Sequence, residues 1–340
     1  MKKNTYTLLF LALAFALSIL SGNAQAQKTK KATVPQTFTN PIGIGADPWV
    51  ITAGEKFWYC GSGKKGIYIS SSDSLHTILK KEKQMAFVPP PNEEYSKEIW
   101  APELFYLQGR WYIYFAADSG KNEYHRMYVL EGGSDPSNPL NGEYVYKGKL
   151  ASEPDNWAID GTILEHGNSL YFIWSGWPGK HNVTQCLYIS RMVNPYTLEK
   201  ERFLISCPDQ EWELNGSPTV NEGPEVIVMG NSVHIIYSAS GSWTDDYCLG
   251  RLTCTNGNFL DRCSWTKTGP VFSRTDDVFG PGHASFVKIP GTNQWWIAYH
   301  AAREKGSGWD RNVRIQPFSW DGEIPVFGKP VSPNVPIQLP

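Results

Sequence analysis

The sequence NEGPEVIVMGNSVHIIYS, residues 221–238, contains the pattern on which the rest of the chain is built. A carboxylate beside Gly-Pro opens it, and an apolar run, a Gly-Asn turn and a second apolar run follow. Two apolar runs around a turn of this kind predict a β-hairpin, here with an acidic side chain where it begins.

Four other segments repeat this outline. Each has an apolar run, a glycine-containing turn and a second run rich in aromatic residues, and the five openings are Asp47, Trp100, Asp160, Glu222 and His283. Consecutive openings are 53 to 62 residues apart. A regular period of this length indicates a repeat architecture.

A third apolar run continues each unit, at residues 66–70, 126–129, 186–190, 248–252 and 312–316. Weaker candidates for a fourth, outer run lie at residues 87–88, 143–146 and 202–205. Three or four antiparallel strands in each of five units predict an all-β fold, a single-domain five-bladed β-propeller over residues 40–340. The inner strands of a propeller all begin at one mouth of the central channel. The five openings should therefore form a ring.

Composition agrees with a β protein that works outside the cell. Aromatic residues make up 14% of the chain, Gly and Pro number 31 and 24, and the net charge is −2. This charge predicts no nucleic-acid partner, and no apolar run beyond the amino terminus is long enough for membrane insertion. We expect a monomer.

The first 26 residues have the features of a secretory signal peptide. Two lysines precede an apolar stretch from Leu8 to Leu20, and small residues follow at Ala24 and Ala26. Cleavage before Gln27 would leave a polar, flexible leader over residues 27–39. The mature protein is then expected to be secreted or periplasmic.

Six cysteines in a chain bound for an oxidising compartment allow disulfides. Cys254 and Cys263 flank an Asn-Gly turn and are the favoured pair. The spacing of Cys and His does not resemble a zinc site.

The predicted ring would hold three carboxylates, an imidazole and an indole. Each has an ordinary explanation, because Asp-Pro, Asp-Gly and Glu-Gly-Pro are common turn sequences. Gathering carboxylates in a channel costs desolvation and repulsion, so their occurrence in three of five repeats favours a function. Two carboxylates across a cleft hydrolyse glycosides, and crowding keeps one of them protonated. The residues alone leave open which carboxylate is the acid.

Aromatic and basic residues near the ring supply candidate sugar contacts. Trp100 holds a ring position, and Trp177 is a further flat apolar surface. Arg314, in the third run of the last unit, is the candidate for binding a hydroxyl or a carboxylate. Core packing and a surface charge are the alternative explanations for Trp177 and Arg314.

The five openings resemble the blade-start motifs of glycoside hydrolase family 43. The matching segments are Ala46-Asp47-Pro48-Trp49, Trp100-Ala101-Pro102-Glu103, Ala158-Ile159-Asp160-Gly161-Thr162, Glu222-Gly223-Pro224-Glu225 and Gly280-Pro281-Gly282-His283. The resemblance covers essentially the whole mature chain and implies an inverting enzyme on a five-bladed propeller.

The same resemblance assigns roles to the catalytic carboxylates. It implies that Asp47 is the general base, that Glu222 is the general acid and that Asp160 tunes the pKa of the acid. Glu225 is the rival for the acid. His283 would be the metal-binding residue, helping to hold a hydrated calcium ion.

The substrate follows less directly. Residues 157–177 and 237–250 look most like α-L-arabinofuranosidase members, which release arabinose from arabinan or arabinoxylan side chains of plant cell walls. The alternatives are a β-xylosidase or an endo-arabinanase of the same family. The chain continues for only 20 residues after Trp320, which leaves no room for the β-sandwich domain common in the β-xylosidases. An alternative of another class, a non-catalytic sugar-binding propeller, would have no need of the three carboxylates.

Overall fold

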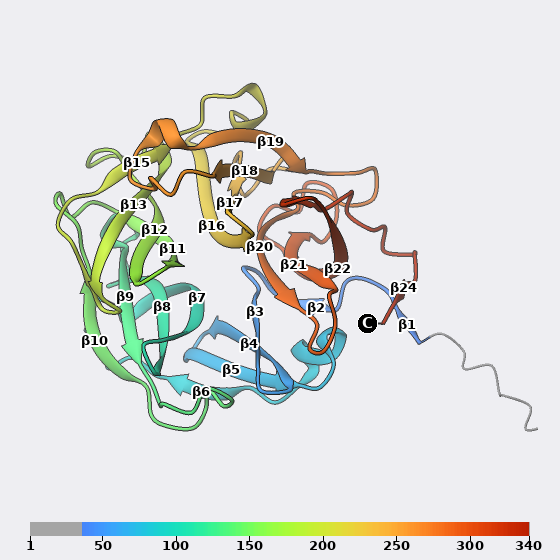
Figure 1. Cartoon of the computed structure of the whole chain (residues 1–340), viewed down its shortest axis with the longest axis horizontal. Coiled ribbons are helices and arrows are strands. Elements are labelled where there is room, and N and C mark those ends of the chain that lie inside the picture. The colour runs from blue at the N-terminus through green and yellow to red at the C-terminus, as the bar shows by residue number, and fades with distance from the viewer. Residues whose placement is uncertain (1–35, 340) are drawn as a thin grey trace, which may run out of the picture. The chain divides into compact units, whose positions relative to one another are not determined.

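Five blades of antiparallel strands surround a central axis in this protein (Figure 1). The structure is a computed structural model that describes residues 36–339. Thr37–Pro340 forms one compact unit. The expected signal peptide and residues 27–35 of the expected leader lie outside the described residues. Among residues 36–339, no helix has the length and hydropathy needed to cross a membrane.

The first two blades each have four strands in chain order. Blade I contains β3 (Trp49–Ala53), β4 (Lys56–Gly63), β5 (Gly66–Ser72) and β6 (Gln84–Phe87). Blade II contains β7 (Lys97–Leu107), β8 (Arg110–Asp118), β9 (Arg126–Glu131) and β10 (Val145–Leu150). The outer strands β6 and β10 overlap the weak fourth runs predicted at residues 87–88 and 143–146.

Blades III and IV are joined by a short parallel pairing of β13 with β16. Blade III contains β11 (Ala158–His166), β12 (Ser169–Gly176), β13 (Thr184–Asn194), β14 (Thr197–Leu198) and β15 (Phe203–Ser206). Blade IV contains β16 (Thr219–Met229), β17 (Ser232–Ala239), β18 (Cys248–Cys254) and β19 (Thr266–Phe272). Short 3-10 turns, η1 (Leu75–Lys80), η2 (Asn122–Tyr124), η3 (Glu211–Glu213) and η4 (Arg262–Ser264), lie in the connections.

Blade V is completed by the amino-terminal end of the described chain. It contains β20 (Gly282–Lys288), β21 (Trp295–Ala302), β22 (Arg311–Asp321) and β23 (Ile324–Val326), and β2 (Gly43–Ile44) pairs with β22. β1 (Thr37–Phe38) then pairs with β24 (Ile337–Gln338). The flexible leader was expected to extend to residue 39. That bound is wrong, because residues 37–38 form a strand. These pairings bring both ends of the propeller together, which closes the circle.

Apolar side chains lie in five clusters, one at each interface between neighbouring blades. Strand β8 shows how one strand serves two clusters. Tyr112 and Tyr114 pack toward blade III, whereas Ile113 and Phe115 pack toward blade I. Because successive side chains of a strand point to opposite faces, a blade covered on both faces needs this nearly continuous apolar sequence.

The inner strands β3, β7, β11, β16 and β20 line the axis, and each contacts the inner strand of both neighbours (Figure 1). Besides Glu98 in β7 (φ 44°), the residue at the equivalent position near the start of each inner strand has a positive φ. These residues are Asp47, Ala101, Asp160, Gly223 and His283, with φ between 41° and 53°. In blades II to V the pairing with the second strand shifts register at this point. The repeated bulge turns the chain at the mouth of the channel.

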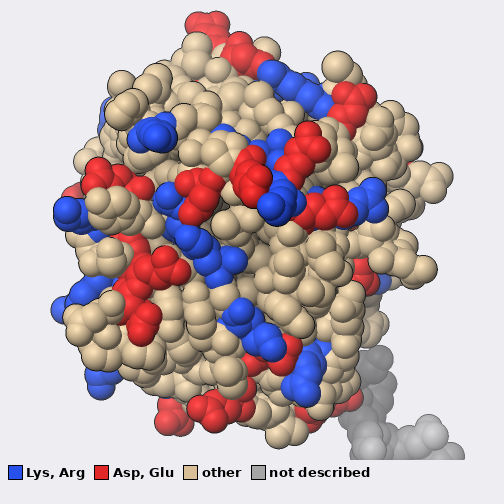
Figure 2. All heavy atoms as spheres, turned by 90° about the vertical axis from the view of Figure 1, so that its left-hand side faces the viewer, with Lys and Arg blue, Asp and Glu red and all other residues tan. Residues whose placement is uncertain are grey.

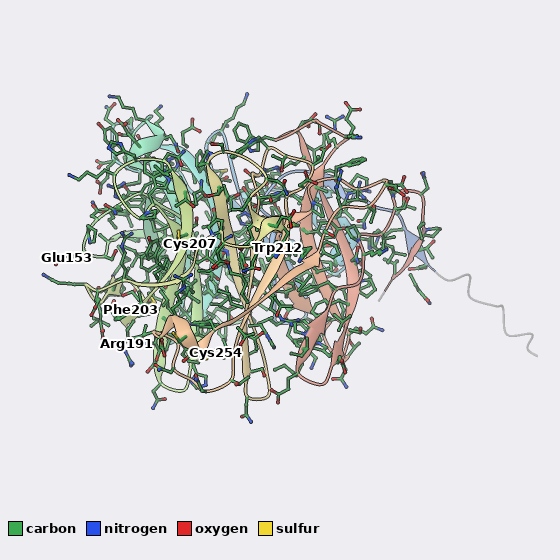
Figure 3. The ribbon with its side chains drawn as sticks, turned by 90° about the horizontal axis from the view of Figure 1, so that it is seen from above. Glu153, Arg191, Phe203, Cys207, Trp212 and Cys254 are labelled. Atoms are coloured by element: carbon green, nitrogen blue, oxygen red, sulfur yellow. A yellow bond between two sulfur atoms is a disulfide. The ribbon has the colours of Figure 1, made fainter. Side chains whose placement is uncertain are left out.

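The disulfide differs from the favoured pair. Cys186 and Cys207 are bonded within blade III, whereas Cys254 and Cys263 are free. Cys207 and Cys254 are labelled in Figure 3. Cys254 is buried in the cluster between blades III and IV, and Cys263 is exposed. Their two side chains therefore face different environments, although a turn separates them.

Acidic and basic side chains alternate on the side of the propeller formed by blades II and III (Figure 2). Several form ion pairs, among them Arg126 with Asp155 at 2.6 Å and Lys149 with Asp155 at 2.9 Å. This mixed surface agrees with the small net charge of −2. Exposed pairs of this kind contribute little to stability, so the clusters between the blades are the main source of it.

Candidate active site

A cavity of about 950 Å³ opens at the mouth of the channel where the inner strands begin. Its lining comes from all five blades and includes every member of the predicted ring: Asp47, Trp100, Asp160, Glu222 and His283. Asp160 and Glu222 are only 4% and 7% exposed. The repeat therefore brings together side chains that are up to 236 positions apart in sequence.

Asp47 is surrounded by three nitrogen-bearing side chains. Its Oδ1 lies 3.2 Å from Nδ1 of His283, 3.2 Å from Nδ1 of His300 and 3.6 Å from Nη1 of Arg311. Burial raises the pKa of Asp47, but these three neighbours outweigh it and hold the pKa well below its usual range. Asp47 is therefore ionised at neutral pH, as a general base must be.

Burial has the opposite net result for Asp160. Desolvation, followed by the nearby charges of Glu222 and Asp47, raises the pKa of Asp160 well above its usual value. The backbone N–H of Gly223 donates a hydrogen bond of 3.0 Å to Oδ2 of Asp160. Asp160 thus holds the peptide that follows Glu222 and fixes the position of that side chain.

Glu222 has a pKa raised to about 7, with burial as the largest cause. The Tyr247 hydroxyl, which donates to Oε1 at 2.8 Å, and the charge of Arg311 both oppose this rise. A carboxyl with a pKa near neutrality is partly protonated where the enzyme works. Glu222 and Asp47 thus differ in pKa in the way that an acid and a base require.

Trp100 is held by a buried histidine beneath it. The Trp100 ring stacks on His125, with centroids 3.8 Å apart and an angle of 25° between planes. Nδ1 of His125 lies 3.1 Å from Oδ2 of Asp118, and its Nε2 lies 3.0 Å from the carbonyl oxygen of Glu98. The indole therefore presents a fixed apolar surface to the cavity, as a sugar contact requires.

Trp177 does not line the cavity. It is buried and stacks in parallel on Trp157, with centroids 4.8 Å apart and an angle of 11°. Trp157 is the member of this pair that lines the cavity. Trp177 therefore supports a lining residue from behind, which is the core-packing alternative for this residue.

The arginine of the site is Arg311, not Arg314. Arg314 is 2% exposed and its Nε donates to Oδ1 of Asn312 at 3.0 Å, away from the cavity. The two arginines are three positions apart in β22, so they point to opposite faces, and Arg314 lies about 10 Å further from the strand start. Third strands run parallel to first strands. The first residue of a third strand therefore lies at the mouth of the channel. In blade V this residue is Arg311, directly before the third run predicted at residues 312–316, so the run itself points to Arg311.

Glu225, the rival acid, lies deeper and outside the cavity lining. Thr162 donates to its Oε2 at 3.3 Å, and burial raises the pKa of Glu225 and of neighbouring Glu103. The bulge places Glu225 two positions beyond the turn. The motif residue before Gly-Pro is thus the one that reaches the cavity.

The donors for the expected calcium ion are few. Within residues 36–339, no group of three His, Cys, Asp or Glu side chains is placed to hold a metal ion. Calcium usually takes six to eight oxygen ligands, whereas His283 offers an imidazole that already faces Asp47. This set does not fit a dedicated calcium site. Calcium binding stays a prediction from the family resemblance.

Comparison with known proteins agrees with this geometry. The sequence model described as "Glycosyl hydrolases family 43" matches residues 38–325. The chain belongs to glycosyl hydrolase family 43. As a family member it is a glycoside hydrolase that acts on O-glycosyl bonds, built on a five-bladed β-propeller.

Several relatives of this family 43 chain carry a more specific name. A protein of Streptomyces avermitilis named extracellular exo-alpha-(1->5)-L-arabinofuranosidase is 33% identical over 96% of this chain and 70% of its own length. A protein of Streptomyces chartreusis with the same name is 31% identical over 86% of this chain and 90% of its own. The crystal structure of an alpha-L-arabinofuranosidase from Lactobacillus brevis superposes with a TM-score of 0.80 at 30% identity, covering 88% of this chain and 98% of that one.

Proposed function

We propose that this chain is an inverting, exo-acting α-L-arabinofuranosidase that releases arabinose from arabinan or arabinoxylan side chains. The observation that carries the proposal is the separation of the pKa values in one cavity, with Asp47 lowered and Glu222 raised to about 7. One carboxylate accepts a proton and another donates one at the same pH. The arabinofuranosidase names of relatives at 31% and 33% identity support the choice of sugar.

In the proposed reaction, Asp47 accepts a proton from a water molecule as that oxygen attacks the anomeric carbon. Glu222 gives its proton to the glycosidic oxygen, so the leaving sugar departs as a neutral alcohol. The new C–O bond forms opposite to the one that breaks, which inverts the anomeric configuration. Solvent then returns Asp47 to the carboxylate and Glu222 to the acid.

Asp160 acts by position and charge. It accepts the Gly223 N–H next to the acid. The charge of Glu222 in turn raises the pKa of Asp160, so ionisation of both carboxyl groups at once is costly. Arg311 lies 3.6 Å from Asp47, and its positive charge lowers the pKa of this proposed base.

The location and assembly state belong to the same proposal. Relatives are named extracellular, and we propose that this protein also acts outside the cytoplasm on plant cell-wall saccharides. We propose that it does so as a monomer, which light scattering of the purified protein tests directly.

The experiment that tests the function uses three substrates: an aryl α-L-arabinofuranoside, an aryl β-xyloside and linear arabinan. Time-resolved NMR identifies the anomer released first. We expect free β-L-arabinose as the first product of the arabinofuranoside and single arabinose units from arabinan. Activity on the xyloside alone would assign the β-xylosidase alternative, and short oligosaccharides from arabinan would assign the endo-acting one. Binding without turnover would point to a sugar-binding propeller.

A further inference from the structure

Two tryptophans form a corner at the edge of the cavity between blades IV and V. Trp243 follows β17, Trp309 precedes β22, and both line the cavity. Their ring centroids are 6.1 Å apart, with an angle of 75° between planes. Trp309 is 68% exposed. A tryptophan so exposed contributes little to a core, so its position beside the cavity calls for another role.

Hydrogen bonds between the two loops fix this corner. Nε1 of Trp309 donates to Oγ of Ser242 at 3.1 Å, and Nη2 of Arg311 donates to the Ser242 carbonyl oxygen at 2.7 Å. The backbone N–H of Gly306 donates to Oδ1 of Asp245 at 2.8 Å. The exposed ring is therefore preorganised, and a ligand that stacks on it loses little additional entropy in ordering the protein.

A floor of glycines supports Trp243. A Cβ at Gly241 would lie 2.7 Å from the indole, and a Cβ at Gly216 would lie 3.2 Å from it. Gly216 also has a φ of 115°, a conformation that other residues rarely adopt. Only glycine at these two positions lets the indole lie this close to the backbone, which keeps Trp243 behind Trp309.

The corner is linked to the proposed acid through Ser242, and Arg311 links the same serine to the proposed base. Ser242, which accepts the hydrogen bond from Trp309, also lies near enough to Glu222 to lower its pKa. The acid must approach the oxygen of the bond that breaks, and this oxygen leaves with the second sugar. A sugar ring bound against Trp309 would lie close to the acid, where the leaving sugar has to be.

We propose that Trp309, backed by Trp243, binds the sugar ring of the leaving group by stacking on its apolar face. The inference rests on the proposed function and identifies the substrate class as an arabinose unit attached to another sugar ring. Flat aromatic rings beside a sugar offer large contact area at small entropic cost. We call the Trp309 and Trp243 pair the platform. The hydrogen bond from Trp309 to Ser242 holds this platform close to Glu222.

The test compares two substrates that share the arabinose unit and an alkoxide leaving group but differ in whether that group has a ring. These are (1→5)-α-L-arabinobiose and methyl α-L-arabinofuranoside. We expect Trp309→Ala to lower kcat/KM for arabinobiose by about tenfold or more, a typical effect of losing one apolar contact. We expect kcat/KM for the methyl glycoside to stay within about twofold, because that substrate does not reach the platform.

Two further variants separate stacking from a structural role. Trp309→Phe keeps a ring without the N–H and is expected to retain most activity on arabinobiose. Tyr106→Ala removes an exposed aromatic at the far end of β7 and should leave both substrates unaffected. Thermal melting of each variant verifies folding.

An unchanged ratio of the two kcat/KM values in Trp309→Ala, or an equal fall for both substrates, would overturn the platform. If the wild-type protein cleaves neither substrate, the proposed function is wrong and the platform proposal falls with it. The two failures are distinguishable, because the first occurs in a protein that still turns over the methyl glycoside.

Discussion

The hydroxyl group of Tyr247 donates a hydrogen bond of 2.8 Å to Oε1 of Glu222. The same tyrosine ring stacks on His300, with centroids 5.6 Å apart and an angle of 7° between planes. Nδ1 of His300 in turn lies 3.2 Å from Oδ1 of Asp47. Tyr247 thus lies between the proposed acid and the groups that hold the proposed base, and it was not among the residues predicted from sequence.

Removal of this hydroxyl should move the high-pH limb of the activity profile. The hydrogen bond from Tyr247 favours the carboxylate form of Glu222 and so lowers its pKa from the value that burial would give. Tyr247→Phe therefore raises this pKa, and the acid stays protonated to higher pH. We expect the high-pH limb of kcat/KM for arabinobiose, near pH 7 in the wild type, to move upward by about half a unit or more.

The matched control is Tyr106→Phe, which removes a hydroxyl that bonds the Ser134 carbonyl oxygen at a distant exposed site. Its profile should superpose on that of the wild type. A high-pH limb that stays in place or moves down in Tyr247→Phe would contradict the pKa argument for Glu222.

The acid and the base should respond differently to the leaving group. Glu222→Gln cannot protonate the glycosidic oxygen, so we expect kcat to fall by about 10³-fold on arabinobiose. A dinitrophenyl arabinofuranoside, whose leaving group needs no proton, should recover most of that loss. Asp47→Asn removes activation of water, which both substrates need, so kcat should fall on both.

Glu225→Gln supplies the comparison for this pair of variants, because Glu225 lies outside the cavity lining. Burial raises the pKa of Glu225 well above its usual value, so an amide resembles the neutral form that burial favours. Its substrate preference should therefore not change. A leaving-group rescue seen in Glu225→Gln, and absent in Glu222→Gln, would transfer the acid role to the rival residue.

Arg311 should influence the high-pH limb of the pH profile. Its charge lowers the pKa of Asp47 and the pKa of Glu222. Arg311→Gln removes this charge, so both pKa values should rise. The histidines still hold the pKa of Asp47 low, so the measurable change should be an upward shift of the high-pH limb, which Glu222 sets. Arg314→Gln should instead lower the melting temperature and leave the profile in place, because Arg314 is buried away from the cavity. The opposite assignment would require Arg314→Gln to move the profile.

The order of the blades and the five residues of the ring could be predicted, because each hairpin is recognisable from its own short segment of sequence and the hairpins recur at a regular spacing. Alternation of apolar residues locates strands, and the turns locate their starts. The register within the ring could not be predicted. Ala101 and Gly223 hold the positive-φ positions of blades II and IV, so Trp100 and Glu222 each lie one residue before the turn. The alternation of apolar and polar residues along a strand does not reveal where a bulge inserts an extra residue.

Other features depend on contacts between distant segments. The strand β2 has two residues, and only its pairing with β22 identifies it. The roles of Tyr247 and His300 depend on how second and third strands return to the mouth. Trp177 and Arg314 were chosen by residue type near the motif, whereas the face of the strand or the stacking partner decides whether such a side chain reaches the cavity.

The disulfide of blade III provides a final prediction, on stability. Cys186 lies in β13 and Cys207 follows β15, the strand that pairs with β13 through Leu187 and Ser206. The bond closes a loop of 21 residues in sequence and ties an outer strand to its blade. Replacing both cysteines by Ala should lower the free energy of unfolding by about 2–4 kcal/mol, since a closed loop restricts the unfolded chain.

The exposed free thiol of Cys263 gives the control for the disulfide, because Cys263→Ser removes a sulfur without opening a loop. We expect denaturant unfolding to show a lower midpoint for the double variant and an unchanged one for Cys263→Ser. Equal midpoints for all three proteins would show that the pairing of β13 with β15 holds this blade without the covalent bond.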